Sequence, residues 1–163
     1  MTRILIACER SQRITKAFRA KGYKAFSCDI ERCLGNRPQW HIQDDCLNII
    51  QESWSLVIAH PPCNNISNVG NRWFNEDRYG DAAKERKEKR VEAVQFVKNI
   101  WHNANTELLA IENPVGWLNN NWRKPDQVFH PYFFGDPESK RTCLWLKNLP
   151  NLVRTHYRVK PKI

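Results

Sequence analysis

Short apolar runs bounded by polar turns alternate along this chain with segments whose apolar residues recur at helical spacing. The runs that predict strands are residues 3–8, 23–28, 55–59, 108–111 and 141–146. Each is short and apolar, as strands buried in a sheet are. Between the first two runs, Ile14, Ala17 and Phe18 share one helical face. Ser11 is placed to cap that helix and Gly22 to end it.

The rest of the chain divides into one long helix and several irregular segments. The clearest helix is predicted over 81–102, and its charged stretch 84–90 indicates a solvated face. Residues 42–50 predict a short strand and a helical turn, whereas 64–81 and 115–137 are expected to be loops. This order of elements predicts an α/β fold of Rossmann-like type, with a mostly parallel sheet and helices on both faces. Ligands of such sheets bind beyond the carboxyl ends of the strands.

Composition favours one globular domain. The chain has 163 residues, of which 41% are hydrophobic and 26% charged. We therefore expect a single domain over 1–163. No apolar run approaches the roughly 18 residues of a membrane span, and the N-terminus lacks a signal peptide's apolar core. The expectation is a cytoplasmic protein without a membrane partner.

Net charge indicates the class of partner, and the cysteines indicate the redox state and whether a metal site is expected. The net charge of +9 favours nucleic acid or nucleotide, the alternative being a soluble protein with a basic surface. Without a secretion signal, the six cysteines are expected to be reduced thiols. Their spacing completes no zinc motif, so no metal site is expected.

Polar residues close several predicted strands. Asp29 ends the second strand, where a carboxylate can bind the ribose hydroxyls of an adenosine cofactor, or can be an ordinary turn residue. The first strand-to-helix turn contains no glycine, so it is neither a P-loop nor a dinucleotide fingerprint. Cys63 follows two prolines after the third strand, and Glu112 ends the next. On adjacent parallel strands, a thiol nucleophile and a proton-sharing carboxyl would form a minimal catalytic pair. By itself, however, a lone cysteine is more often a packed hydrophobe.

These motifs, in this order, resemble those of cytosine carbon-5 DNA methyltransferases, and more closely small phage and prophage proteins of that type. The segments that carry the resemblance are AHPPC at 59–63, IENP at 111–114, GDPESKRT at 135–142, and AFRAKG at 17–22 ahead of Asp29. The resemblance covers about residues 3 to 150. The resemblance implies a minimal fold of the S-adenosylmethionine-dependent methyltransferase type.

The resemblance also implies a reaction and the residues that carry it. The Cys63 thiolate would add to carbon 6 of cytosine, Glu112 would bind the ring near nitrogen 3, and Lys140 or Arg141 would steady the ring oxygen. Carbon 5 would then take a methyl group from S-adenosylmethionine. Asp29 would bind the cofactor's ribose. The full set of implied cofactor residues is Cys8, Glu9, Ser11, Asp29, Ile30, Asp45, Cys46 and Pro61.

DNA is the implied substrate, with the target base flipped out of the duplex. The loop after Cys63 and the aromatic loop beyond 115 are the expected DNA contacts. Their candidate residues are Asn64, Asn71, Arg72, Trp73, Trp117, Trp122, Arg123 and Lys124. Trp145 lies in a predicted strand and is expected in the core.

Three departures from the family pattern keep other functions open. Arg10 and Gln12 replace the two glycines of the cofactor turn, and 138–142 reads Glu-x-Lys-x-Thr in place of Gln-x-Arg-x-Arg. In addition, 163 residues leave no room for a separate target-recognition domain. Sequence recognition would need the 115–134 loop, a homodimer or another partner. The alternatives are a nucleic-acid-binding or inhibitory relative without the cofactor, and an enzyme that modifies a free pyrimidine nucleotide. If phage-encoded, the protein would act in the host cytoplasm.

Overall fold

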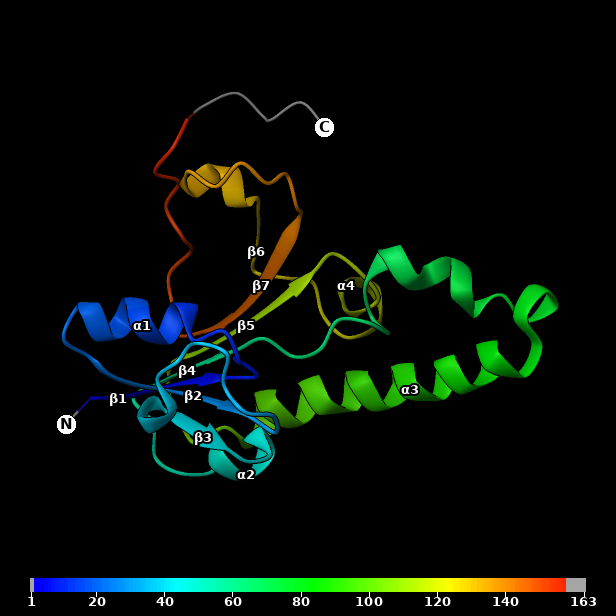
Figure 1. Ribbon diagram of the computed structural model, residues 1–163. Coiled ribbons are helices and arrows are strands. Elements are labelled where there is room, and N and C mark those ends of the chain that lie inside the picture. Colours follow the sequence, from blue (N-terminus) through cyan, green and yellow to red (C-terminus); the bar gives the residue numbers. More distant parts are fainter. Residues whose placement is uncertain (1, 158–163) are drawn as a thin grey trace.

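A twisted seven-stranded sheet forms the centre of the molecule (Figure 1). The computed structural model describes residues 2–157. The strands are β1 (Arg3–Ala7), β2 (Lys24–Asp29), β3 (His41–Gln43), β4 (Leu56–Ala59), β5 (Leu109–Pro114), β6 (Gln127–Phe129) and β7 (Thr142–Lys147). The α-helices are α1 (Arg13–Ala20), α2 (Cys46–Ile49), α3 (Glu76–Asn103) and α4 (Leu118–Asn121), and the 3₁₀ helices are η1 (Pro38–Trp40), η2 (Asn68–Phe74) and η3 (Pro131–Phe134).

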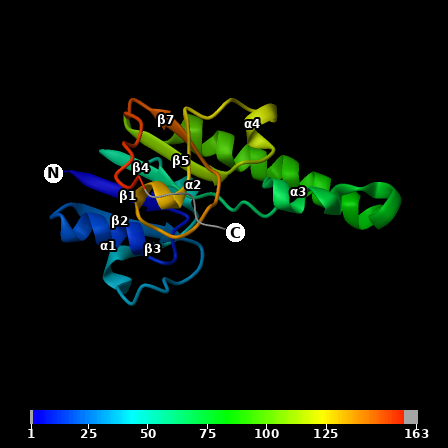
Figure 2. The same ribbon diagram turned by 90° about the horizontal axis from the view of Figure 1, so that it is seen from above.

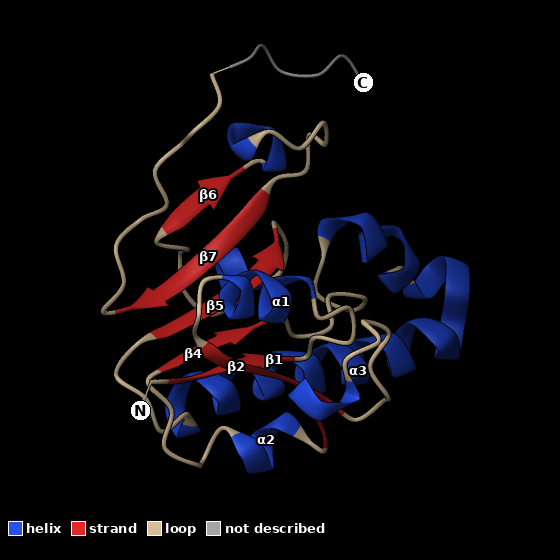
Figure 3. Cartoon of the chain, turned by 60° about the vertical axis from the view of Figure 1, so that its left-hand side comes forward, coloured by secondary structure: helices blue, strands red, loops and turns tan. Residues whose placement is uncertain are grey.

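The strand order is β3-β2-β1-β4-β5-β7-β6. The first five strands are parallel, β7 runs antiparallel to β5, and β6 runs antiparallel to β7. Helix α1 covers one face, and α2 and α3 cover the other (Figure 3). The predicted mostly parallel α/β sheet with helices on both faces is therefore confirmed.

Successive side chains of β1 point to opposite faces of the sheet, and this explains why helices must cover both faces. Ile4 and Ile6 pack toward α1, in a cluster that includes Phe18. Leu5 and Ala7 belong to the larger core against α2 and α3. A strand whose side chains are buried on both sides must lie in the interior of the sheet, and β1 pairs with both β2 and β4.

The cap of α1 differs from the prediction. The helix begins at Arg13, and the main cap comes from Glu9 rather than Ser11. The Glu9 carboxylate accepts the backbone N–H groups of Ile14, at 2.7 Å, and Thr15, at 3.2 Å. A carboxylate is the stronger acceptor at a helix N-terminus because it opposes the positive end of the helix dipole. Gly22 follows the helix with a positive φ of 85°, as its predicted role requires.

The predicted loops contain short elements. Helix α3 begins at Glu76 rather than 81, and Gly80 interrupts it with φ 50° and ψ −129°. The 115–137 segment holds α4, β6 and η3. Strand β6 was missed because its three residues carry no pattern of their own and are held by pairing with β7. Strand β5 continues beyond Glu112 to Pro114 because β7 pairs with it that far.

One part of the molecule stands away from the sheet. Residues 64–90, which we call the arm, comprise η2 and the first turns of α3 and project beyond the strands (Figures 1 and 2). Its base lies at the carboxyl end of β4, directly after Cys63.

Candidate active site

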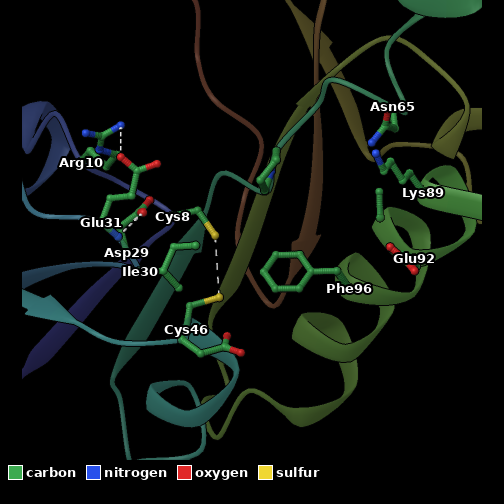
Figure 4. A pocket seen from close by; sticks show the side chains of 13 residues that line it. Cys8, Arg10, Asp29, Ile30, Glu31, Cys46, Asn65, Lys89, Glu92 and Phe96 are labelled. Atoms are coloured by element: carbon green, nitrogen blue, oxygen red, sulfur yellow. Dashed lines mark hydrogen bonds and ion pairs between the residues drawn. The ribbon is translucent and has the colours of Figure 1, made fainter. Parts of the chain in front are cut away.

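A cavity of about 740 Å³ opens at the carboxyl ends of β1, β2 and β3, between these strands and α3 (Figure 4). Five of the predicted cofactor residues line it, namely Cys8, Asp29, Ile30, Asp45 and Cys46. Phe96 and Glu92 of α3 form the opposite wall, with Lys89 and Asn65 nearby (Figure 4). The position is the one that parallel sheets use for ligands.

Local turn chemistry holds the two aspartates in place. Asp29 Oδ1 accepts the backbone N–H of Glu31 at 3.0 Å. Asp45 caps α2 by accepting the N–H of Leu47 at 2.9 Å. In each case the short side chain closes a turn with its own backbone, which fixes the carboxylate at the cavity wall.

The cavity is acidic although the protein is basic. Its charged lining residues are Arg10, Asp29, Glu31, Asp45, Lys89 and Glu92. Four carboxylates and two cations give this lining a formal charge of −2, against +9 for the whole chain. Such a lining favours a cationic ligand and disfavours a phosphate-bearing one.

Three cysteines lie at the end of the sheet beside the cavity. The sulfur atoms of Cys8 and Cys46 are 3.7 Å apart (Figure 4). The hydrogen bond with Cys8, together with burial, raises the pKa of the Cys46 thiol. Burial raises the pKa of Cys28 to about 12. Cys28 and Cys46 are therefore protonated, uncharged groups at neutral pH.

The remaining predicted cofactor residues lie elsewhere. Glu9 is buried, and its carboxylate also accepts the Thr15 hydroxyl, at 2.6 Å. Glu9 and Ser11 line a second cavity of about 390 Å³, on the other side of the β1 turn. Pro61 is buried, and the adjacent Pro62 reaches the first cavity in its place.

Arg10 and Gln12, which were expected to stand in place of two glycines of the cofactor turn, lie in different surroundings. Arg10 lines the first cavity and forms an ion pair with Glu31, at 2.7 Å. Gln12 is fully buried with φ 56°, a left-handed conformation that favours glycine. Its side-chain amide bonds the backbone of Arg37 at 2.9 and 3.1 Å and thereby fastens the 30–37 loop.

The AHPPC segment (59–63) and the IENP segment (111–114) are joined at the carboxyl edge of β4 and β5, which are adjacent and parallel. His60 Nδ1 lies 3.0 Å from Glu112 Oε2. Asn113, almost fully buried, donates its side-chain amide to the Pro61 carbonyl at 2.8 Å. The sequence prediction missed His60 as a partner of Glu112. Its signal was an imidazole at the end of a strand, directly before the double proline.

Cys63 stands at the base of the arm and is half-buried. Its carbonyl accepts the N–H groups of Ile66, at 3.1 Å, and Ser67, at 2.9 Å, which makes the turn rigid. Cys63 lines neither of the two cavities. Lys140 and Arg141 are exposed and precede β7, whose first residue pairs with Pro114 at the same edge of the sheet.

The predicted DNA contacts fall into two groups. Asn64, Asn71, Arg72 and Trp73 belong to the arm, where the Arg72 guanidinium lies 4.6 Å above the Trp73 ring. Asn64, Asn71 and Arg72 are exposed and Trp73 is half-buried. An exposed cation beside an aromatic ring suits contact with a nucleic acid.

The second group, near α4, is less open than expected. Trp122 packs against Trp101 and Trp145, with ring centroids 5.6 Å apart in both pairs, so it is partly buried against the core. Arg123 forms an ion pair with Asp126 at 2.7 Å. Trp117 and Lys124 remain exposed. Trp145 is fully buried, as predicted.

Arg90 corrects the prediction of a uniformly solvated charged stretch. It is only 6% exposed, and its Nε donates to the Asn65 carbonyl at 2.7 Å. Its guanidinium lies 3.3 Å from the centre of the Phe74 ring and 4.3 Å from that of Trp117. Burial lowers the pKa of Arg90. Arg90 therefore connects α3 with the segment that contains Asn65 and Phe74, and with Trp117 outside the arm.

No helix within residues 2–157 is both long and apolar enough to cross a bilayer. No group of three or more His, Cys, Asp or Glu side chains in that range is arranged to hold a metal ion.

Comparison with known proteins places the fold. No protein-family model and no curated protein matches the sequence. A solved structure from E. coli, described as a candidate DNA modification methyltransferase encoded within a prophage, superposes with a TM-score of 0.55 at 12% identity. The match covers 90% of this chain and 46% of the other, so this chain spans about half of that structure's length. The chain has a methyltransferase-like α/β fold.

Proposed function

We propose that this protein methylates carbon 5 of cytosine in DNA, with S-adenosylmethionine as the methyl donor and Cys63 as the nucleophile. The observation that carries the proposal is the joining of the two motifs at one edge of the sheet. The bonds His60–Glu112 and Asn113–Pro61 hold the Cys63 turn against β5, beside the acidic cavity.

The acidic cavity fits the methyl donor in size and charge. Its volume of about 740 Å³ lies within the 300–1,000 Å³ typical of small-molecule sites. S-adenosylmethionine, when bound, supplies a methyl group on a positively charged sulfonium. The Asp29 carboxylate would bind the ribose hydroxyls, and Asp45, Cys46 and Phe96 would surround the adenine. The ion pair with Glu31 offsets the charge of Arg10, one of the two cations that line the cavity.

The chain's own residues would then activate the base. The Cys63 thiolate forms a bond to carbon 6 of cytosine, which makes carbon 5 nucleophilic. Glu112 binds the ring at nitrogen 3, and Lys140 or Arg141 binds the ring oxygen. The arm, with Asn64, Asn71, Arg72 and Trp73, would hold the DNA from which the base is flipped.

Cofactor binding is the first test. Calorimetry with S-adenosylmethionine is expected to show micromolar affinity. Asp29→Asn keeps the acceptor for the Glu31 N–H but removes the negative charge, so affinity should fall at least tenfold. Asp136→Asn, a matched change in an exposed turn, should leave affinity unchanged. Absence of binding at millimolar cofactor would overturn the proposal for this chain.

The nucleophile is tested with DNA that contains 5-fluorocytosine. Fluorine blocks release of the base after methyl transfer, so a covalent protein–DNA complex should survive denaturation. Cys63→Ala should abolish both the complex and methylation while cofactor affinity is kept. Cys33→Ala, another half-buried thiol, is the control. Methylation by Cys63→Ala would show that the nucleophile is wrongly assigned.

One feature favours a second candidate function. Arg10 and Gln12 stand where the family has glycines, and Arg10 lines both cavities. This second function is that of a nucleic-acid-binding protein without the cofactor. It predicts that the protein binds DNA but gives no calorimetric signal with S-adenosylmethionine.

A further inference from the structure

His60 lines the second cavity, next to the proposed methyl-donor site. This cavity, of about 390 Å³, is lined by His60 together with Arg10, Arg13, Ser11 and Asp29. It shares Cys8, Arg10 and Asp29 with the first cavity, so the two meet at the end of β1. The backbone N–H of His60 donates to the Ala7 carbonyl at 3.0 Å, which fixes the residue at this meeting point.

The imidazole of His60 is oriented by one ring nitrogen and leaves the other without a partner. Nδ1 lies 3.0 Å from Glu112 Oε2, while Nε2 is buried and has no hydrogen-bond partner among residues 2–157. The His60 and Glu112 side chains are 23% and 24% exposed. A carboxylate that accepts the Nδ1–H proton leaves the lone pair on Nε2. The result is a base with a fixed orientation.

Three other groups near the meeting point cannot take this role. The Glu9 carboxylate is occupied by α1 at three sites. Arg10 and Arg13 are cations without a lone pair to accept a proton.

We propose that His60 is the general base of the site and that Glu112 positions it. The inference rests on the proposed function. After methyl transfer, the C5–H bond breaks and its proton passes to His60 Nε2. The electron pair of that bond forms the C5=C6 double bond, and the C6–S bond breaks to return the Cys63 thiolate. His60 then releases the proton to water, so atoms and charges balance.

The proposal predicts where the reaction stops when the base is removed. His60→Ala should still form the Cys63–DNA bond and transfer one methyl group per protein. Because the C5 proton stays in place, a complex resistant to denaturation should accumulate on ordinary cytosine DNA, which no fluorine blocks. Turnover should fall by about 10²- to 10⁴-fold, the usual contribution of a general base. Added imidazole should restore turnover and dissolve the complex.

Two variants distinguish loss of the basic nitrogen from loss of folding. His60→Gln can still donate a hydrogen bond to Glu112 but has no basic nitrogen, so it should accumulate the same complex. His102→Ala, at the exposed end of α3, should behave as the unmodified protein. Unchanged cofactor affinity and melting temperature would show that each variant is folded.

The outcomes distinguish a failure of the role of His60 from a failure of the proposed function. Full turnover by His60→Ala and His60→Gln, or slow turnover without a trapped complex and without rescue by imidazole, overturns the role of His60. The unmodified protein's methylation and its complex with 5-fluorocytosine DNA would in that case stand. Absence of both in the unmodified protein overturns the proposed function, and this inference with it.

Discussion

At the scale of single residues, Glu9 shows how a position at a strand end can serve the fold rather than the ligand. Its buried carboxylate satisfies two N–H groups and one hydroxyl at the start of α1. Glu9→Ala should lower the free energy of unfolding by about 3 kcal/mol, since bonds to a buried charged acceptor and a helix cap are both lost. Urea denaturation measures the change. Glu52→Gln, an exposed partner of Arg3, should cost less than about 0.5 kcal/mol. Equal costs would show that Glu9 does not carry the cap.

The buried thiol of Cys28 makes the unfolding free energy depend on pH. Its pKa rises from 9.0 to about 12 on folding because the thiol is buried. Below pH 9 both states hold the proton. Above pH 9 only the unfolded chain releases the proton, so the contribution of Cys28 to the unfolding free energy is lost as the pH rises toward 12. The unfolding free energy should fall more steeply in the native protein than in Cys28→Ala, by at most about 1.4 kcal/mol per pH unit. Denaturation at pH 8 to 10.5 tests this, and Cys33→Ala should keep the native slope.

At the scale of elements, the arm depends on one buried cation. Arg90 joins the Asn65 carbonyl and the Asn71 side chain while it packs on Phe74 and Trp117. Arg90→Met should destabilise the arm by about 3 kcal/mol, from lost charged hydrogen bonds and cation–π contacts. Proteolysis within residues 64–80 should become at least tenfold faster, while cleavage elsewhere is unchanged. Lys84→Met, exposed on the same helix, is the control. An unchanged rate in Arg90→Met would contradict the role of the anchor.

The sequence predicted elements where pattern and burial coincide. The five apolar runs became β1, β2, β4, β5 and β7, and β4 and β5 are adjacent and parallel, as the sequence hypothesis supposed. Strand β6 escaped because its stability comes from β7 and from bonds between Gln127 and Leu152, 25 residues away. The His60–Glu112 contact joins residues 52 apart, and only the register of β4 and β5 brings them together. Local patterns carry no information on such pairings.

At the scale of the whole molecule, charge is divided between two places. The cavity lining is acidic, whereas the protein carries +9. A cationic methyl donor and a polyanionic acceptor would thus be drawn to different parts of one surface. The arm, which begins directly after Cys63, supplies exposed cations and half-buried aromatic rings, and α1 supplies cations on the other side of the sheet.

This division predicts a salt dependence that depends on position. If DNA lies along the arm, the logarithm of affinity should fall linearly with the logarithm of salt concentration, by about 0.9 per neutralised phosphate. Arg72→Ala should then reduce the slope by about 0.9, since one phosphate contact is lost. Lys16→Ala, an exposed cation on α1, should leave the slope unchanged. Fluorescence anisotropy with a short duplex at several salt concentrations measures both slopes. Equal changes in the two variants would mean that DNA responds to net charge alone, and the arm would lose its assignment as the DNA-binding element.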